Sequence, residues 1–204
     1  MTPEGEIVAA PWRGAMMGNR GCLHGPDNTL GRARWRHANW VCCVTEFRGR
    51  HRLPMPPPGS PTVYTALFFW DEAAAFAAGH RPCAECRNAD WRRFRAVLER
   101  VLGPESRGAP ASALDRALHR DRLQGVAPKH PARHEALAAD LPDGTFVRLS
   151  DGRAGCLWAD ACLPWRQTGG YDAPVKRPMG TVEVLTPSLL VATFHAGYRP
   201  VIRA

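Results

Sequence analysis

The stretch GHRPCAEC at positions 79–86 places the strongest constraint on the fold, because two of its cysteines are separated by two residues. This spacing lets both thiolates bind one tetrahedral ion, with backbone N–H groups of the turn directed at the sulfurs. Zn²⁺ is the ion that such donors favour. Two alternatives are thioredoxin-like redox chemistry, in which the motif follows a strand of a βαβ unit, and a pair of unligated core cysteines. An Ala-rich helix is predicted before this motif, which favours the metal.

One Cys-x-x-Cys supplies only half of a structural zinc site, so further ligands must come from elsewhere in the chain. Upstream, Cys42 and Cys43 are adjacent on a predicted strand, where neighbouring side chains face opposite ways. Only one of the two is therefore expected to reach the metal. The expected ligands are Cys43, Cys83 and Cys86. The candidates for the fourth position are Cys42, Cys22 and His24.

The run LFFWDEAAAFAAGHRPCAECR over residues 67–87 resembles the second half of the zinc-binding domain of Ada-type DNA alkylation-repair proteins. The resemblance covers about 30 residues, from Tyr64 to Phe94. It implies a zinc ion held by four thiolates, one of which accepts a methyl group from a DNA phosphotriester. The chain departs from that family in its first cysteine pair, which is adjacent and followed by a longer, Pro-rich spacer. The pattern of the whole chain also resembles a group of bacterial proteins of about this size.

Nothing downstream resembles the helix-turn-helix of the Ada-type family or its Pro-Cys-His-Arg methyltransferase site. The resemblance therefore carries over the metal, whereas alkyl transfer does not carry over with it.

The positive charge of the chain comes almost entirely from arginine. The net charge is +8, and the 27 basic residues include only two lysines. Arginine presents a planar fork that suits phosphate, so a nucleic-acid partner, DNA in particular, is one interpretation. The other is a coding bias of a GC-rich genome. The candidate phosphate contacts are Arg48, Arg50, Arg81, Arg87, Arg92 and Arg93.

The first half of the chain predicts a mixture of strands and helices. Residues 1–34 are Gly-rich and predicted to be irregular, and residues 40–44 and 62–69 predict strands. Asp71 and Gly79 are suitable cap and stop residues for a helix over about 72–78. A longer helix is predicted from Asn88 to about Leu102, because apolar residues recur there at helical spacing.

The second half predicts short helices followed by a small sheet. Helices are expected over about 112–123, over 133–140 and from Pro187 to Gly197, and strands near 145–149, 155–159 and 181–185. We therefore predict an α+β protein, with a zinc-binding Ada-like unit over residues 1–104 and a short-helix and β-sheet half over 112–204. A single continuous domain is the alternative.

The second half also offers polar groups for catalysis. His119 and Arg122 share one face of a predicted helix, and Arg133 and His134 open the next predicted helix. If they converge on a phosphate, a histidine can shuttle its proton near neutral pH. His119, Arg122 and His134 are the candidate catalytic residues. In the Gly-rich loop that follows, Trp165 and Tyr171 can stack on a flat ligand or plug a small barrel.

The composition narrows the class of protein. The sequence contains no run of 18 apolar residues and no signal-peptide core, so we expect no membrane segment and a cytoplasmic location. An odd number of cysteines around a Cys-x-x-Cys suits a metal in a reducing compartment. Three functions are therefore considered. The first is a zinc protein that binds nucleic acid, and DNA repair by a zinc-bound thiolate is one form of it. The second is a phosphate-directed hydrolase or nuclease with structural zinc, and the third is a non-catalytic, zinc-stabilised interaction protein.

Overall fold

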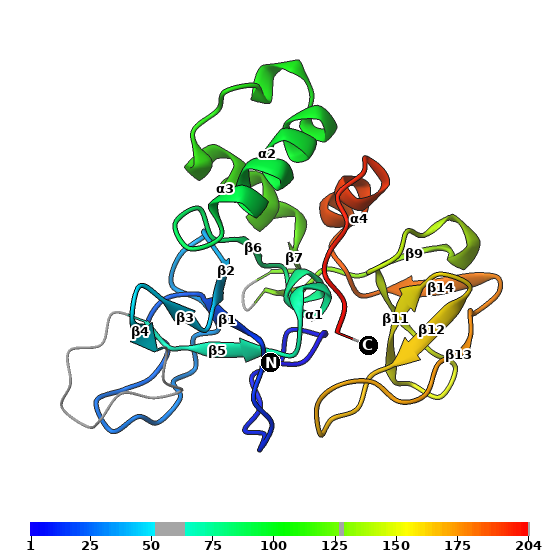
Figure 1. The fold of residues 1–204 in the computed structure, drawn as a ribbon, viewed down its shortest axis with the longest axis horizontal. Coiled ribbons are helices and arrows are strands. Elements are labelled where there is room, and N and C mark those ends of the chain that lie inside the picture. The colour runs from blue at the N-terminus through cyan, green and yellow to red at the C-terminus, as the bar shows by residue number, and fades with distance from the viewer. Residues whose placement is uncertain (52–63, 127–128, 204) are drawn as a thin grey trace.

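The computed structural model describes residues 1–51, 64–126 and 129–203, with helices and strands in several small sheets. The fold is therefore α+β, as predicted. A four-stranded sheet and a six-stranded sheet lie on either side of the helix α1, Glu72–Ala77 (Figure 1). Of the helices in the described ranges, none has the length and apolar character needed to cross a bilayer.

The four-stranded sheet is formed by the N-terminal part of the chain, in the order β5-β1-β2-β6. Its strands are β1 Met16–Asn19, β2 Val41–Val44, β5 Leu67–Phe69 and β6 Arg81–Pro82. β1 pairs antiparallel with both β2 and β5, whereas β6 pairs parallel with β2. A short hairpin of β3 Glu46–Phe47 and β4 Arg50–His51 follows β2.

The strand β1 lies at the centre of this sheet, although the Gly-rich sequence around it predicts irregular structure. Gly18 explains the difference: a Cβ atom there would lie 2.3 Å from the Phe69 ring, so the close approach of the two strands requires glycine. The prediction of an irregular segment over residues 1–34 was thus wrong at its centre. The predicted strand over 62–69 is observed for its last three residues, and residues 62–63 lie outside the described ranges.

The helix α1 begins and ends where the sequence predicts. An oxygen of Asp71 accepts a hydrogen bond from the Ala74 N–H over 2.8 Å, which caps the helix. Gly79 adopts a φ of +82°, a conformation that glycine adopts without steric cost and that stops the helix. All six residues of α1 are buried, so the helix forms part of the core.

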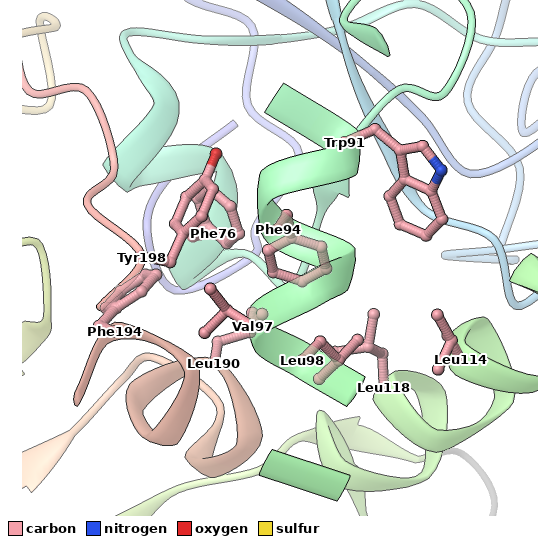
Figure 2. Packing of buried hydrophobic residues seen from close by; sticks show 10 residues of the cluster. All are labelled: Phe76, Trp91, Phe94, Val97, Leu98, Leu114, Leu118, Leu190, Phe194 and Tyr198. Carbon is pink, nitrogen blue, oxygen red and sulfur yellow. The ribbon is translucent and has the colours of Figure 1, made fainter. Parts of the chain in front are cut away.

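Helix α2, Asn88–Leu102, buries the apolar stripe predicted for it. Phe94 and Leu98 are completely buried, and they pack with Phe76 of α1 and with apolar residues of two further helices (Figure 2). Those helices are α3 Ala111–Asp121 and α4 Ser188–His195.

The C-terminal part of the chain forms the six-stranded sheet, in the order β13-β12-β11-β10-β14-β9. Its strands are β9 His134–Leu137, β10 Phe146–Arg148, β11 Ala154–Trp158, β12 Ala161–Pro164, β13 Val175–Lys176 and β14 Thr181–Val184. The minor elements are β7 Leu123–Gln124, β8 His130–Pro131 and the 3-10 turns η1 Pro104–Ser106 and η2 Ala138–Asp140.

The predicted helix over residues 133–140 is wrong, because most of this segment is the strand β9 followed by η2. In β9, residues 134 and 136 are half-buried while 135 and 137 are exposed, which is the two-residue period of a strand. β9 pairs antiparallel with β14 over all four residues. Pairing between distant segments therefore determines the structure here.

The first turn of α1 is anchored to the C-terminal end of the chain. The buried carboxylate of Glu72 accepts hydrogen bonds from the Tyr198 hydroxyl and the Val201 N–H, each over 2.8 Å. Asp71 likewise accepts from the Tyr171 hydroxyl over 2.8 Å. Residues from the two predicted units thus share one buried polar network, while the division of the chain into two domains stays a prediction.

Candidate metal centre

Three cysteine sulfurs from two distant segments of the chain come together. Cys43 lies on β2, Cys83 directly follows β6, and Cys86 lies two residues before α2. Their sulfur atoms all lie within 4.8 Å of one another. Within the described ranges, this is the one place where three or more Cys, His, Asp or Glu donor atoms lie close enough together to hold a metal ion. The segments outside those ranges contain none of these four residue types.

The parallel pairing of β2 with β6 brings the sulfurs together. Val41 is paired with Arg81 and Cys42 with Pro82, so the same register places Cys43 opposite Cys83. The turn after Cys83 closes with a hydrogen bond from the Arg87 N–H to the Cys83 carbonyl over 3.1 Å. This turn returns Cys86 to the other two sulfurs.

Backbone N–H groups are directed at these sulfurs, as in thiolate metal sites. The Glu85 and Cys86 amides bond to the Cys83 sulfur, and the Val44 amide bonds to the Cys86 sulfur. The pKa of Cys83 is lowered by its hydrogen bonds with Cys43 and Cys86. The pKa of Cys43 is raised by its hydrogen bonds with the same two partners, Cys83 and Cys86, and by burial. The cluster therefore favours a single negative charge, and a divalent cation would let all three thiols ionise.

The donor set fits a soft or borderline divalent ion. Three thiolates with N–H···S bonds match the ligands that zinc takes, and a tetrahedral ion would keep one further position. Cys43 is buried, whereas Cys83 and Cys86 are partly exposed. The Cys83–Cys86 turn is therefore the side of the cluster that is open to solvent.

The three candidates for a fourth protein ligand lie elsewhere. Cys42 faces the core cluster around Leu67 and Phe69, and its sulfur accepts from Arg87 over 3.8 Å. The Nδ1 atom of His24 lies within hydrogen-bonding distance of the Thr65 hydroxyl. The Cys22 thiol donates to a backbone carbonyl, that of His24. The structure thus brings together the preferred ligands and separates them from the alternatives.

Two arginines predicted as phosphate contacts are buried instead, and they hold the Cys83–Cys86 turn in place. Arg81 forms a bidentate ion pair with Asp115 of α3, over 2.9 and 2.8 Å, and both side chains are only 5% exposed. Its guanidinium carbon also lies 4.3 Å from the centre of the Trp91 ring. The prediction for Arg81 is corrected accordingly, since its donors are taken up inside the protein.

Arg87 has the same kind of role on the other side of the loop. It donates to Glu72 of α1 over 2.6 Å and to Asp90 of α2 over 2.7 Å, and its side chain is 4% exposed. The prediction that Arg87 contacts phosphate is therefore also corrected, because its side chain forms buried ion pairs inside the protein. Glu72 and Asp115, the carboxylates of these ion pairs, could not be identified from the sequence, because an acidic residue in a helix gives no signal that it will be buried beside an arginine.

The exposed arginines predicted to contact nucleic acid lie near the cluster along the chain. Arg48 is in the hairpin turn that follows Cys43, and Arg92 and Arg93 are in the first two turns of α2. Arg93 forms an ion pair with Asp90. The side chain of Arg50 lies outside the described part of the chain.

The candidate catalytic residues do not form one site. His119 packs against the rings of Trp35 and Trp40 and contacts Arg122. His134 lies on β9 opposite Val184. Its neighbour Arg133 donates to the backbone carbonyls of residues 4, 132 and 185. His119 thus contacts Arg122, and Arg122 and Arg133 line one cleft, but no contact among the described residues joins His119 to His134.

The aromatic loop of the second half is part of the core. Trp165 is 4% exposed, and the Tyr171 hydroxyl bonds to Asp71. Both rings pack near Phe146 in the interior of the protein, beside the six-stranded sheet.

Comparison with known protein families, with curated proteins and with solved structures finds no match to this chain. The Ada-type resemblance therefore still depends on residues 64–94 of the sequence alone.

Proposed function

We propose that the protein binds a single zinc ion through Cys43, Cys83 and Cys86 and acts on nucleic acid at that centre. The observation that carries the proposal is the group of three sulfurs within 4.8 Å, contributed by β2 and by the turn after β6. Support comes from the N–H···S bonds, which favour thiolates, and from the exposed Arg48 and Arg92 that are near the cluster in sequence. Bound zinc would keep the sulfurs deprotonated at neutral pH.

We propose alkyl transfer to sulfur as the reaction of this centre. The ground is the nucleophilicity of zinc-bound thiolates, because the Ada-type resemblance carries over only the metal. The sulfur of Cys83 or Cys86 would attack the methyl carbon of a DNA methyl phosphotriester. An S–C bond forms and a C–O bond breaks, and the electron pair of the broken bond stays on the phosphate oxygen, which becomes a phosphodiester anion. No proton has to move, because the sulfur reacts as the thiolate.

The experiment incubates the purified, reduced protein with an oligonucleotide that carries one methyl phosphotriester and measures the intact mass of the protein. We expect zinc in equimolar amount by elemental analysis and a mass gain equal to one methyl group replacing one proton. Peptide mapping should place that methyl group on Cys83 or Cys86. A protein without metal would overturn the zinc site. Equimolar zinc without methylation would leave a structural zinc and overturn alkyl transfer.

A further inference from the structure

A basic cleft of about 1130 Å³ lies between the N-terminal strands and the C-terminal half. Its lining includes residues 77–79 at the end of α1, Trp40 just before β2, and Trp165 of the C-terminal loop. Volumes of this order are typical of small-molecule sites. The cleft and the Cys83–Cys86 turn are close along the chain, because residue 79 of the lining lies only four positions before Cys83.

The charges of the cleft are unbalanced. Its lining contains eight arginine or lysine side chains and three carboxylates, a net charge of +5. Two of these carboxylates are already paired, Glu4 with Arg148 over 3.1 Å and Asp172 with Arg153 over 2.6 Å. The remaining positive charge concentrates the electrostatic field in the cleft and favours an anionic ligand.

Arg20 is the most unusual of these groups, because its charge is buried without a described counter-ion. The residue is 3% exposed. Among the described residues its hydrogen-bond acceptors are neutral: Nε2 of His80 over 3.3 Å and the carbonyl of Ala78 over 2.8 Å. Its pKa is lowered by burial and then by the charge of Arg122, and no carboxylate opposes this shift.

Arg122 brings a second buried charge to the same place. It is 3% exposed, donates to the Gly79 carbonyl over 2.6 Å, and its Nε atom has no hydrogen-bond partner within the described part of the chain. The guanidinium carbons of Arg20 and Arg122 lie 3.8 and 4.0 Å from the centre of the Trp40 ring. Two cations thus stack on one indole. Among the described residues no carboxylate forms an ion pair with either, although the charges of Asp115 and Asp121 act on Arg122 from a greater distance.

Burying a charge without a partner is strongly unfavourable, and two like charges close together add to that cost. Cation–π contacts and carbonyl acceptors offset part of it. A doubly charged anion in the cleft would offset the remainder, and guanidinium forks match phosphate oxygens in geometry and charge. Trp165, whose indole N–H has no described partner, offers a further donor on the lining.

We propose that this cleft binds the phosphate of a nucleotide, with Arg20 and Arg122 as the central counter-charges. The phosphate can come from a free nucleotide or from the backbone of a single-stranded nucleic acid. Binding of a nucleic-acid backbone rests on the proposed function, whereas binding of a free nucleotide is independent of it. No hydrogen bond or ion pair among the described residues joins Arg20 or Arg122 to a cysteine of the metal cluster.

The test measures thermal unfolding and equilibrium binding with three probes: pyrophosphate, adenosine monophosphate and a short oligothymidylate, with sodium chloride at matched ionic strength as reference. We expect at least one phosphate probe to raise the Tm of the wild-type protein beyond the chloride reference, since a ligand that binds only the folded state stabilises it. Binding of the mononucleotide identifies a free nucleotide as the source. Binding of the oligothymidylate alone identifies the nucleic-acid backbone. If none of the probes binds, the proposal is overturned.

Variants separate a binding role from a structural one. Arg20→Met should weaken binding of the best probe by about tenfold or more, because a charge-assisted hydrogen bond is lost. Without ligand, its Tm should equal or exceed that of the wild type, because a buried charge is removed. Unchanged binding in Arg20→Met would overturn the proposal. It would also be overturned if the ligand-free Tm of Arg20→Met were lower than that of the wild type and no anion raised the Tm of the wild type or the variant.

Arg34→Met provides a second variant, because this residue lines the cleft and is exposed, so we expect its removal to have little effect on stability. We expect several-fold weaker binding at unchanged ligand-free Tm. Arg116→Met is the matched control: Arg116 is exposed on α3 and is not part of the lining, so its removal should leave binding unaffected. Equal losses in Arg34→Met and Arg116→Met would indicate only a general effect of net charge and would contradict a defined site. If the protein binds a phosphate probe but contains no zinc, the phosphate-binding proposal is supported and the proposed zinc-dependent function is overturned.

Discussion

The amide of Cys83 donates a hydrogen bond to the carbonyl of Cys42 over 3.0 Å. This bond sets the register of β6 against β2, and it leaves the Cys42 side chain in the core while its neighbour Cys43 faces the other sulfurs. Two adjacent cysteines therefore have different environments. A one-residue shift in register would exchange their faces.

The first prediction uses this pair. Cys43→Ser should remove most of the bound zinc, because it deletes one of three sulfur donors, whereas Cys42→Ser should keep equimolar zinc. Elemental analysis of both variants after gel filtration gives the measurement. Zinc retained in Cys43→Ser and lost in Cys42→Ser would show that the sulfurs have been assigned to the wrong faces of β2.

The second prediction concerns the buried ion pair of Arg81 and Asp115. Asp115→Asn should lower the free energy of unfolding by about 3–5 kcal/mol, because it leaves the Arg81 charge buried and without its carboxylate. Asp151→Asn is the control: Asp151 pairs with Arg153 at the surface, so this change should have a much smaller effect on stability. Urea unfolding measures both. Similar losses in the two variants would mean that Arg81 finds another partner.

The third prediction concerns Gly79. Its φ of +82° and the Arg122 Cδ atom, 2.8 Å from where a Cβ would lie, both oppose a side chain. Gly79→Ala should therefore destabilise the fold by about 1–3 kcal/mol. Gly197→Ala isolates the backbone contribution, because φ is +108° there but a Cβ would meet no atom within 4 Å. Thermal unfolding should rank Gly79→Ala as the more damaging change, and the reverse order would contradict the close contact with Arg122.

The fourth prediction is a pH dependence of stability. The pKa of His119 is lowered to about 4, by burial first and then by the charges of Arg122, Lys129 and His37. Between pH values of about 6.5 and 4 the unfolded chain binds a proton that the folded protein does not, so the free energy of unfolding falls as the pH falls through this window. Above it, the contribution is fully present.

His119→Gln should reduce that loss of stability, as measured by urea unfolding at about pH 7.5 and about pH 4.5, on either side of most of the titration. The exposed His195 supplies the control variant His195→Gln, which should behave like the wild type. An unchanged pH profile in His119→Gln would mean that other buried groups account for the whole effect.

The sequence predicts those parts of the fold that depend on local signals. Asp71, Gly79 and the apolar spacing from Trp91 to Leu98 define α1 and α2, because capping and periodicity act within one or two turns. The spacing of Cys83 and Cys86 predicts two of the three sulfurs that the structure brings together, and the alternation of side chains in β2 predicts that only one of Cys42 and Cys43 joins them.

What the sequence could not predict depends on contacts between distant residues. β1 has a Gly-Asn end and becomes a central strand only because Phe69 fills the space above Gly18. Arg81 and Arg87 resemble surface arginines until the folded chain places Asp115 and Glu72 beside them. Arg20 gave no local signal, because its role depends on the positions of Trp40 and Arg122.

The separation of Cys43 and Cys83 along the chain has a consequence for folding. An ion held by both would act as a cross-link around a loop of about 40 residues, including the Pro-rich segment, and would remove conformational freedom from the denatured ensemble. Metal supplied early would bring β2 and β6 together before the rest of the sheet has formed, so refolding should be faster than in the presence of a chelator.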